Sequence, residues 1–281
     1  DGTNTKRTTV SYYGASLFGL PEYVRVYDTD LSTVLKESHT VYNLDAAYTS
    51  RRIIGLAGTV EVKGRDGSGL DLVSKVTYGY DAGNFDGAGQ NISPVGHDGT
   101  NYGSGFVAGR GNLTSETRWN VESGKESNSA YAIGSSAKYN TAGAVVSQTT
   151  PWDGTSTRTV TIDYTDSFNS SGIAATYAYP TKITDPAGSY SQVKYRYDIG
   201  ANIEASSPAP GGQTYGKTTK RVYDDDNGRL EKDSVYINTT EKSYARYEYP
   251  DNGIQSRVYS TITDTNANGV GDSADEVLAE S

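Results

Sequence analysis

A motif of paired aromatic residues, an acidic turn with glycine and an aliphatic restart recurs at a fixed spacing in this chain. It reads YRYDIGANI at 195–203, VYDDDNGRL at 222–230 and YEYPDNGI at 247–254, so Tyr197, Tyr223 and Tyr249 stand 26 residues apart. A fixed period of this kind indicates a repeat architecture, in which neighbouring units bury each other's faces. The repeat constrains the fold more than any other feature.

Each unit is patterned as a strand followed by a tight turn. Aromatic and aliphatic residues at 193, 195 and 197 alternate with charged residues at 194, 196 and 198, which is the period-two pattern of a half-exposed strand. The Asn-Gly pairs at 227–228 and 252–253 are predicted to supply the two positive-φ residues of a tight hairpin.

Further copies of the motif extend along most of the chain. YGYDAGN at 78–84 and YNTAGAV at 139–145 repeat it, GRGNLTS at 109–115 matches its second half, and TDPAG at 184–188 resembles the turn that often precedes a unit. The pattern Tyr-Asp-x-x-Gly-Arg/Asn-aliphatic resembles the YD repeat of the RHS/YD-repeat proteins. These include the teneurins, the shell subunits of some bacterial toxins and long secreted proteins of soil bacteria.

The resemblance implies a long β-sheet wound as a spiral shell or solenoid with a tyrosine-rich lining. It implies a structural segment of a secreted or cell-surface bacterial assembly, serving encapsulation, adhesion or fibre formation, with no catalysis of its own. A self-cleaving core motif and a toxin domain are not found, so auto-proteolysis and cargo are not carried over.

Composition supports an all-β chain with many hairpins and little helix. The 24 Tyr offset the scarcity of aliphatic residues, because Tyr and Val favour strands and can build the core, and the 32 Gly favour tight turns. The absence of Cys excludes disulfides and thiol chemistry. The net charge of −9 argues against nucleic-acid binding, and no apolar run is long enough for membrane insertion.

We expect one continuous YD-repeat region over 1–281, processed or cut from a longer chain, because the sequence contains no Met. Repeat-like sequence reaches both ends without a polar cap. Uncapped sheets expose edges that template pairing. The expected partners are therefore more of the same polypeptide, or identical subunits joined through sheet edges.

Carbohydrate binding through exposed Tyr and Trp is the alternative function, and a glycosidase drawn from the 34 carboxylates is a weaker one. Trp119 and Trp152 are predicted to be packing anchors, with a sugar-stacking platform as the alternative. Arg51 and Arg52 are predicted to lie on a solvated strand edge rather than at an anion site. His39 is expected to be a solvated strand residue.

Several other segments have expected local roles. Residues 31–42 are expected to form a strand pair, and 122–137 a long exposed loop. The glycines of 84–112 are turn residues rather than a phosphate loop, since no Lys-Ser/Thr follows them. His97 lacks a partnered Ser or Cys motif, so no catalytic triad is expected.

A calcium loop is predicted over 264–276. Oxygen-bearing residues occupy positions 1, 3, 5, 9 and 12 with Gly at 6, which is EF-hand spacing, and Asp at position 12 resembles the dockerin loop. The alternative is an Asn/Gly-rich turn without an ion. A strand is expected over 257–263, and a short helix over 273–278 is an option. The expected Ca²⁺ ligands are Asp264, Asn266, Asn268, the Val270 carbonyl, Asp272 and Asp275, with Glu276 in reserve.

Overall fold

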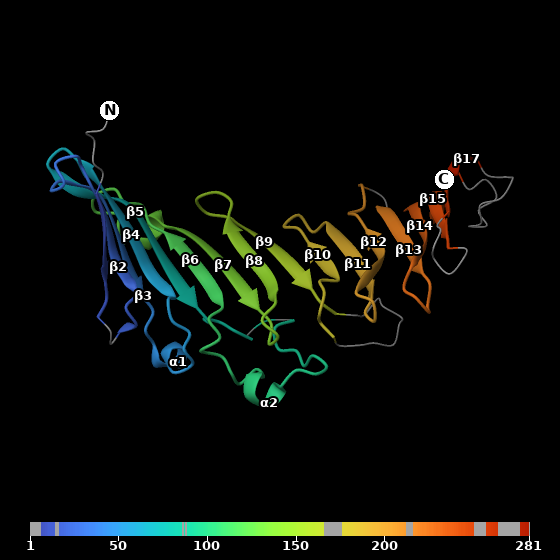
Figure 1. Cartoon of the computed structure of the whole chain (residues 1–281), viewed down its shortest axis with the longest axis horizontal. Helices are drawn as coiled ribbons and strands as arrows, with labels where there is room; N and C mark the ends of the chain where they lie inside the picture. Colours follow the sequence, from blue (N-terminus) through green and yellow to red (C-terminus); the bar gives the residue numbers. More distant parts are fainter. Residues whose placement is uncertain are drawn as a thin grey trace. The chain divides into compact units, whose positions relative to one another are not determined.

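The computed structural model describes residues 7–14, 17–85, 87, 89–165, 176–211 and 216–249, and the backbone of the strands at 257–263 and 276–280. The chain divides into two compact units, Asp1–Thr159 and Val160–Ser281. Figure 1 labels helices and strands of both. Each unit is described by itself below.

The first unit is an antiparallel meander in which each strand pairs with its neighbours in sequence. Short helical segments interrupt it at α1 (Ala46–Thr49), at α2 (Gly99–Tyr102) and at a 3₁₀ turn, Ser129–Tyr131. The strands are β1 (Thr8–Tyr12), β2 (Pro21–Tyr27), β3 (Val34–Tyr42), β4 (Ala57–Asp66), β5 (Gly69–Tyr80), β6 (Leu113–Arg118), β7 (Ile133–Tyr139), β8 (Val145–Pro151) and the start of β9 (Thr157–Asp163).

The second unit continues the same connectivity. The end of β9 pairs with β10, and each later strand pairs antiparallel with the next. Its strands are β10 (Lys182–Thr184), β11 (Tyr190–Arg196), β12 (Ala201–Ser206), β13 (Lys217–Tyr223), β14 (Leu230–Ile237), β15 (Thr240–Glu248), β16 (Arg257–Thr263) and β17 (Glu276–Glu280). The prediction of an all-β chain with many hairpins and little helix is confirmed.

Few hydrophobic side chains are buried. Among the described residues these are Tyr48, Val146 and Tyr244, which are two tyrosines and one valine, as the composition predicted. Many other large apolar side chains on the strands stay exposed, Ile133 at 59% for example. The strands therefore form a sheet whose faces are only partly covered, and its stability depends heavily on contacts along the sheet.

One turn recurs with the same hydrogen bonds in both units. In the turn after β7, the Asn140 N–H donates to Ala144 O at 2.9 Å, and Asn140 Oδ1 accepts the N–H groups of residues 142 and 144 at 3.0 Å each. In the turn after β10, the Asp185 N–H donates to Ser189 O at 2.8 Å, and its Oδ1 accepts from 187 and 189 at 2.9 Å each. The side-chain oxygen of the Asx residue thus organises the turn.

Glycine is required at the fourth position of this turn. Gly143 has φ of +84° and Gly188 has φ of +87°, in the left-handed region that L-residues avoid. The turn after β13 is one residue longer, and there Gly228 has positive φ but Asn227 does not. The prediction that Asn-Gly at 227–228 supplies two positive-φ residues is therefore wrong. This longer turn is closed by the Asp224 N–H, which donates to Arg229 O at 2.8 Å, and it needs only one residue with positive φ.

The tyrosines of the motif are placed by β-bulges. The register shifts immediately before a strand-ending tyrosine, and a bulge bends the strand and re-aims the side chain that follows. Among the described residues, the tyrosines that follow a bulge in this way are Tyr12, Tyr27, Tyr42, Tyr80, Tyr139 and Tyr223.

In three hairpins of the described residues, a tyrosine at or just after the end of the second strand donates its hydroxyl to the first carbonyl of the preceding strand. We call this contact the tyrosine clasp. Tyr80 donates to Ala57 O at 3.0 Å, Tyr139 to Leu113 O at 3.0 Å, and Tyr249 to Leu230 O at 2.8 Å. The clasp satisfies a carbonyl at the open end of the hairpin, so the tyrosine of the repeat has a hydrogen-bonding role as well as a packing role.

Some local predictions are wrong. Arg51 and Arg52 lie in a turn after α1, not on a strand edge, because the Asp45 carboxylate caps α1 at the Ala47 N–H and the segment winds into a helical turn. Residues 31–42 form a turn and the single strand β3, because Asp30 and Asp28 organise the turn that joins it to β2.

Two further boundaries differ from expectation. The loop predicted over 122–137 ends earlier, because β7 begins at Ile133 and pairs with β6. A helix over 273–278 is not formed, since Glu276–Glu280 is strand β17, paired with β16.

Candidate functional site

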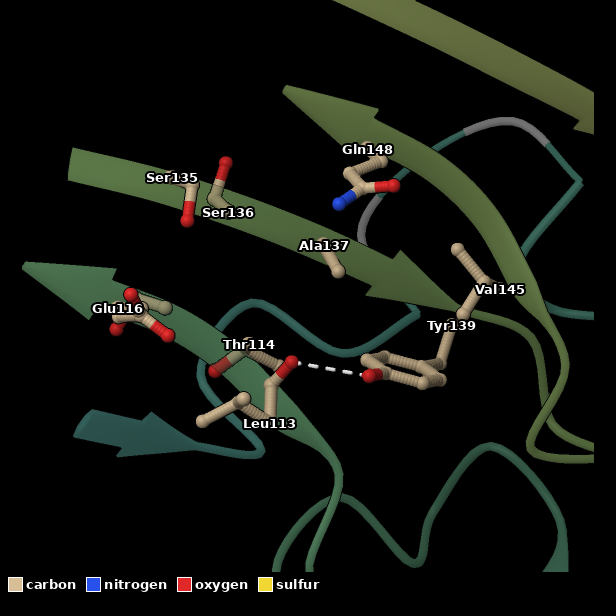
Figure 2. A pocket seen from close by; sticks show the side chains of 10 residues that line it. Leu113, Thr114, Glu116, Ser135, Ser136, Ala137, Tyr139, Val145 and Gln148 are labelled. Atoms are coloured by element: carbon tan, nitrogen blue, oxygen red, sulfur yellow. Dashed lines mark hydrogen bonds between the residues drawn. The ribbon is translucent and has the colours of Figure 1, made fainter. Parts of the chain in front are cut away.

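A shallow trough of about 230 Å³ lies over β7 in the first unit. Small residues at its centre create it, because Ser135 and Ala137 on β7 stand between the larger Glu116 on β6 and Gln148 on β8. The register supports this geometry, since Glu116 pairs with Ser135 and Ala137 pairs with Gln148. Figure 2 shows Glu116 and Gln148 on either side of Ala137. The adjacent strands thus present a carboxylate and an amide across a narrow floor.

A tyrosine clasp closes one end of the trough. Tyr139 lines it, and the hydrogen bond from its hydroxyl to Leu113 O holds the side chain across the ends of β6 and β7 (Figure 2). Burial raises the pKa of the Tyr139 phenol, with the Asp81 carboxylate adding to the effect, so the hydroxyl keeps its proton. The hydrogen bond to Leu113 O fixes the Tyr139 ring as one wall of the trough.

Hydrogen bonds of the buried residue Thr114 also fix the floor at that end. The Thr114 side chain is 5% exposed, and its Oγ1 accepts from the Ala82 N–H at 3.1 Å and donates to Gly79 O at 3.2 Å. Farther along β6, Arg118 Nε lies 3.0 Å from Glu116 Oε1. The Arg118 side chain is 72% exposed, so the pair contributes little stability but balances the charge of the carboxylate.

The Asp81 carboxylate anchors the long insertion of residues 82–112 beside the trough. It accepts three successive backbone N–H groups, from Arg110 at 2.9 Å, Gly111 at 3.0 Å and Asn112 at 2.9 Å. In this copy of the motif the aspartate binds the last residues of a long insertion, and not the N–H groups of a short turn. Two causes raise the pKa of the neighbouring Tyr48 to about 12: desolvation by burial is the larger, and the charge of Asp81 is the next.

Arg110 holds the insertion together from inside. Its guanidinium donates to the carbonyls of Phe106 at 2.7 Å, Thr141 at 2.7 Å and Gly103 at 3.0 Å, and also to that of Tyr102. The rings of Phe85 and Phe106 lie 4.7 and 5.0 Å from it. Burial lowers the pKa of Arg110. Its role is structural, because its guanidinium donates to backbone carbonyls.

The other residues singled out from the sequence lie apart from the trough. Trp119 is half-buried, and its Nε1 donates to Thr77 Oγ1 at 3.0 Å, which confirms it as a packing anchor. Trp152 is 58% exposed at the β8–β9 turn with Arg158 over its ring, so its prediction as an anchor is wrong. His39 is a half-buried residue of β3 whose ring stacks on Tyr23 at 4.2 Å.

The predicted calcium ligands, Asp264, Asn266, Asn268, Val270, Asp272 and Asp275, lie outside the described residues. Within the described ranges, no three His, Asp or Glu side chains converge as a metal site. No helix in those ranges is long and apolar enough to cross a membrane. The trough could not be found from the sequence, because it arises from the register of three strands rather than from a motif.

Comparison with known proteins gives distant likenesses only. No protein-family model matches the chain, and no curated protein matches it. Among solved structures, TcdB2-TccC3 is 11% identical over 99% of this chain and 12% of that one, with a TM-score of 0.39. The Photorhabdus luminescens Tc holotoxin pore is 10% identical over 98% of this chain and 14% of that one, with a TM-score of 0.33.

A porin-like protein from Bacteroides uniformis is 10% identical over 92% of this chain and 87% of that one, with a TM-score of 0.24. The chain thus spans only 12% and 14% of the two toxin chains. These likenesses are too distant to assign a family.

Proposed function

We propose that this chain is a wall segment of an extracellular YD-repeat assembly and carries no catalysis of its own. The observation that supports this most directly is the repetition of one fastening device, the tyrosine clasp at Tyr80, Tyr139 and Tyr249. The same contact closes two hairpins of the first unit, β4–β5 and β6–β7, and the hairpin β14–β15 of the second. Recurrence of one contact is expected of a structural repeat whose stability is a sum of neighbouring contacts.

A link between successive turns supports the same role. The Arg196 guanidinium donates to the carbonyls of Tyr223 and Asp224 at 3.2 and 3.1 Å, and so connects the turn after β11 to the turn after β13. Ile199 of the first turn lies against Gly228 of the second, where an added Cβ would come within 3.1 Å of the Ile199 side chain. Contacts between neighbouring turns stiffen a sheet along its length.

The proposed partners are further YD-repeat polypeptide or identical subunits, joined through sheet edges. Strand β1 pairs only with β2 in the part of the chain that the structure describes. Its sequence TTVSY carries no charge, and Val10 and Tyr12 are 41% and 59% exposed. An uncharged strand with one unpaired edge is a template for another strand. A secreted or cell-surface bacterial location follows from this proposal.

Electron microscopy and sedimentation velocity of the 281-residue chain test the proposal. We expect extended or hollow particles whose size grows with protein concentration. The variant Val10→Lys places a charge on the β1 edge and should reduce this growth, whereas Val95→Lys, at a loop position 74% exposed, should leave it unchanged. A monomer at all concentrations would contradict the proposal.

The absence of catalysis is tested separately. Chromogenic glycosides should show no turnover above the buffer rate, because retaining and inverting mechanisms both need a placed pair of carboxylates. Turnover abolished by a single Asp→Asn or Glu→Gln substitution would show that the chain is a glycosidase instead.

A further inference from the structure

The trough over β7 offers hydrogen-bonding groups that the chain itself does not use. Within the described residues, neither the Gln148 amide nor the Ser135 hydroxyl has a hydrogen-bonding partner. Glu116 uses Oε1 for Arg118, which leaves Oε2 able to accept a further bond. Three strands therefore present a donor and acceptor amide, a hydroxyl and a carboxylate oxygen around one small floor.

These groups are held on rigid elements. Each stands on a strand hydrogen-bonded to its neighbour, and the tyrosine clasp fixes the wall at Tyr139. The rigid strands fix where these side chains start, so a ligand that binds has to order only their side-chain torsions. A few convergent polar groups beside an aromatic ring are typical of small-molecule sites.

We propose that this trough binds one ring of a neutral saccharide. A pyranose carries several hydroxyl groups, each both donor and acceptor, and an apolar ring face. Gln148 and Ser135 suit hydroxyls that donate or accept, Glu116 Oε2 suits a donating hydroxyl, and the Tyr139 ring suits the apolar face. The volume of about 230 Å³ is smaller than a drug-sized pocket and is suited to a single ring.

The charge of the trough favours a neutral ligand. Glu116 is the only ionisable carboxylate among the lining residues, and Arg118 balances it at 3.0 Å. A cationic ligand would have to displace Arg118 or share the carboxylate with it. The single carboxylate also makes this a binding site rather than a hydrolytic one, because glycoside cleavage needs two.

Saturation-transfer NMR followed by titration calorimetry on the 281-residue chain tests the proposal. The probes are glucose, galactose, mannose and N-acetylglucosamine, with n-butylamine as a cationic probe. We expect saturable binding of at least one sugar and no binding of the amine. Ala137→Leu fills the floor and should abolish binding, whereas Ala130→Leu adds the same volume at an exposed position outside the trough and should leave it unchanged.

Two milder variants keep the test independent of folding. Glu116→Gln should weaken sugar binding by about tenfold, because a charge-assisted hydrogen bond is lost. Glu122→Gln, an exposed carboxylate outside the trough, is its matched control. Circular dichroism confirms that each variant is folded. The proposal is overturned if no sugar binds up to about 50 mM, because binding with a Kd of several millimolar would be detected at that concentration. It is also overturned if the amine binds instead, or if sugar binding survives Ala137→Leu.

Discussion

The Nη1 atom of Arg196 lies 3.1 Å from the carbonyl oxygen of Asp224, so an arginine at the end of β11 holds the turn that follows β13. The same guanidinium donates through Nε to Asp198 in its own turn, at 3.1 Å to each carboxylate oxygen. One side chain thus joins two successive copies of the repeated turn. A guanidinium spreads its donors over three nitrogen atoms, whereas the three donors of an ammonium group share one nitrogen.

Replacing Arg196 with Lys should therefore loosen the second turn although the charge is kept. We expect faster hydrogen exchange at residues 224–229 and a lower thermal midpoint, because an ammonium group cannot bridge both turns. Lys217→Ala removes an exposed cation from the same unit and should change neither. Unchanged exchange at 224–229 in the Lys variant would show that the bridge is not formed in solution.

The tyrosine clasp predicts a cost for removing a single hydroxyl. Tyr80→Phe leaves the Ala57 carbonyl without its donor and should lower the free energy of unfolding by about 1–2 kcal/mol. The matched control is Tyr12→Phe, at a side chain that is 59% exposed, and it should be neutral. Urea unfolding followed by tyrosine fluorescence measures both. Equal midpoints for the two variants would remove the clasp as a stabilising contact.

The repeated turn predicts a conformational requirement for glycine. Gly143→Ala places a Cβ at φ of +84° and should destabilise the chain by about 1 kcal/mol. Gly154→Ala is the control, because Gly154 does not have a positive φ and an added Cβ would have no neighbouring atom within 4 Å. Thermal melting compares them. A Gly143→Ala midpoint at or above that of the control would contradict the turn geometry.

The turn after β8 predicts an acid-sensitive contribution to stability. Backbone donation from the N–H groups of Thr155 and Ser156 lowers the pKa of Asp153 to about 2. Because the folded pKa lies below the unfolded value of about 3.9, the contribution is fully present above pH about 4. It is lost as the pH falls through about 2. Carboxyl carbon NMR should show Asp153 titrating well below the usual aspartate value of about 3.9, and a midpoint near 4 would contradict this prediction.

The loop at 264–276 predicts a calcium-dependent stability. For a Kd of about 10⁻⁴–10⁻³ M, 10 mM Ca²⁺ should stabilise the folded chain by about 1.4–2.7 kcal/mol over chelator. Asp264→Ala should remove the shift, and Asp251→Ala, outside the loop, should keep it. Differential scanning calorimetry measures the midpoints. A midpoint that does not respond to Ca²⁺ would leave the segment as an Asn/Gly-rich turn.

The sequence by itself determined the all-β class, the repeat and the residues that make its turns, because these depend on local properties. Alternation in residues 193–198 sets the strand face, and Asx and Gly at fixed offsets set turns such as 140–144 and 185–189. It also indicated the use of Tyr and Val for burial. Each of these inferences needs only a few neighbouring residues and their backbone preferences.

The tertiary structure alone decided where those residues point. Bulges before Tyr80 and Tyr139 re-aim side chains that strict alternation would have placed otherwise, and so allow the clasps. Asp81 binds residues about 30 positions away because an insertion separates β5 from β6. The trough likewise depends on the register that sets Glu116 and Gln148 beside the small residues of β7. Register pairs residues from different strands, and it is fixed only when the turns and the buried face of the sheet form together.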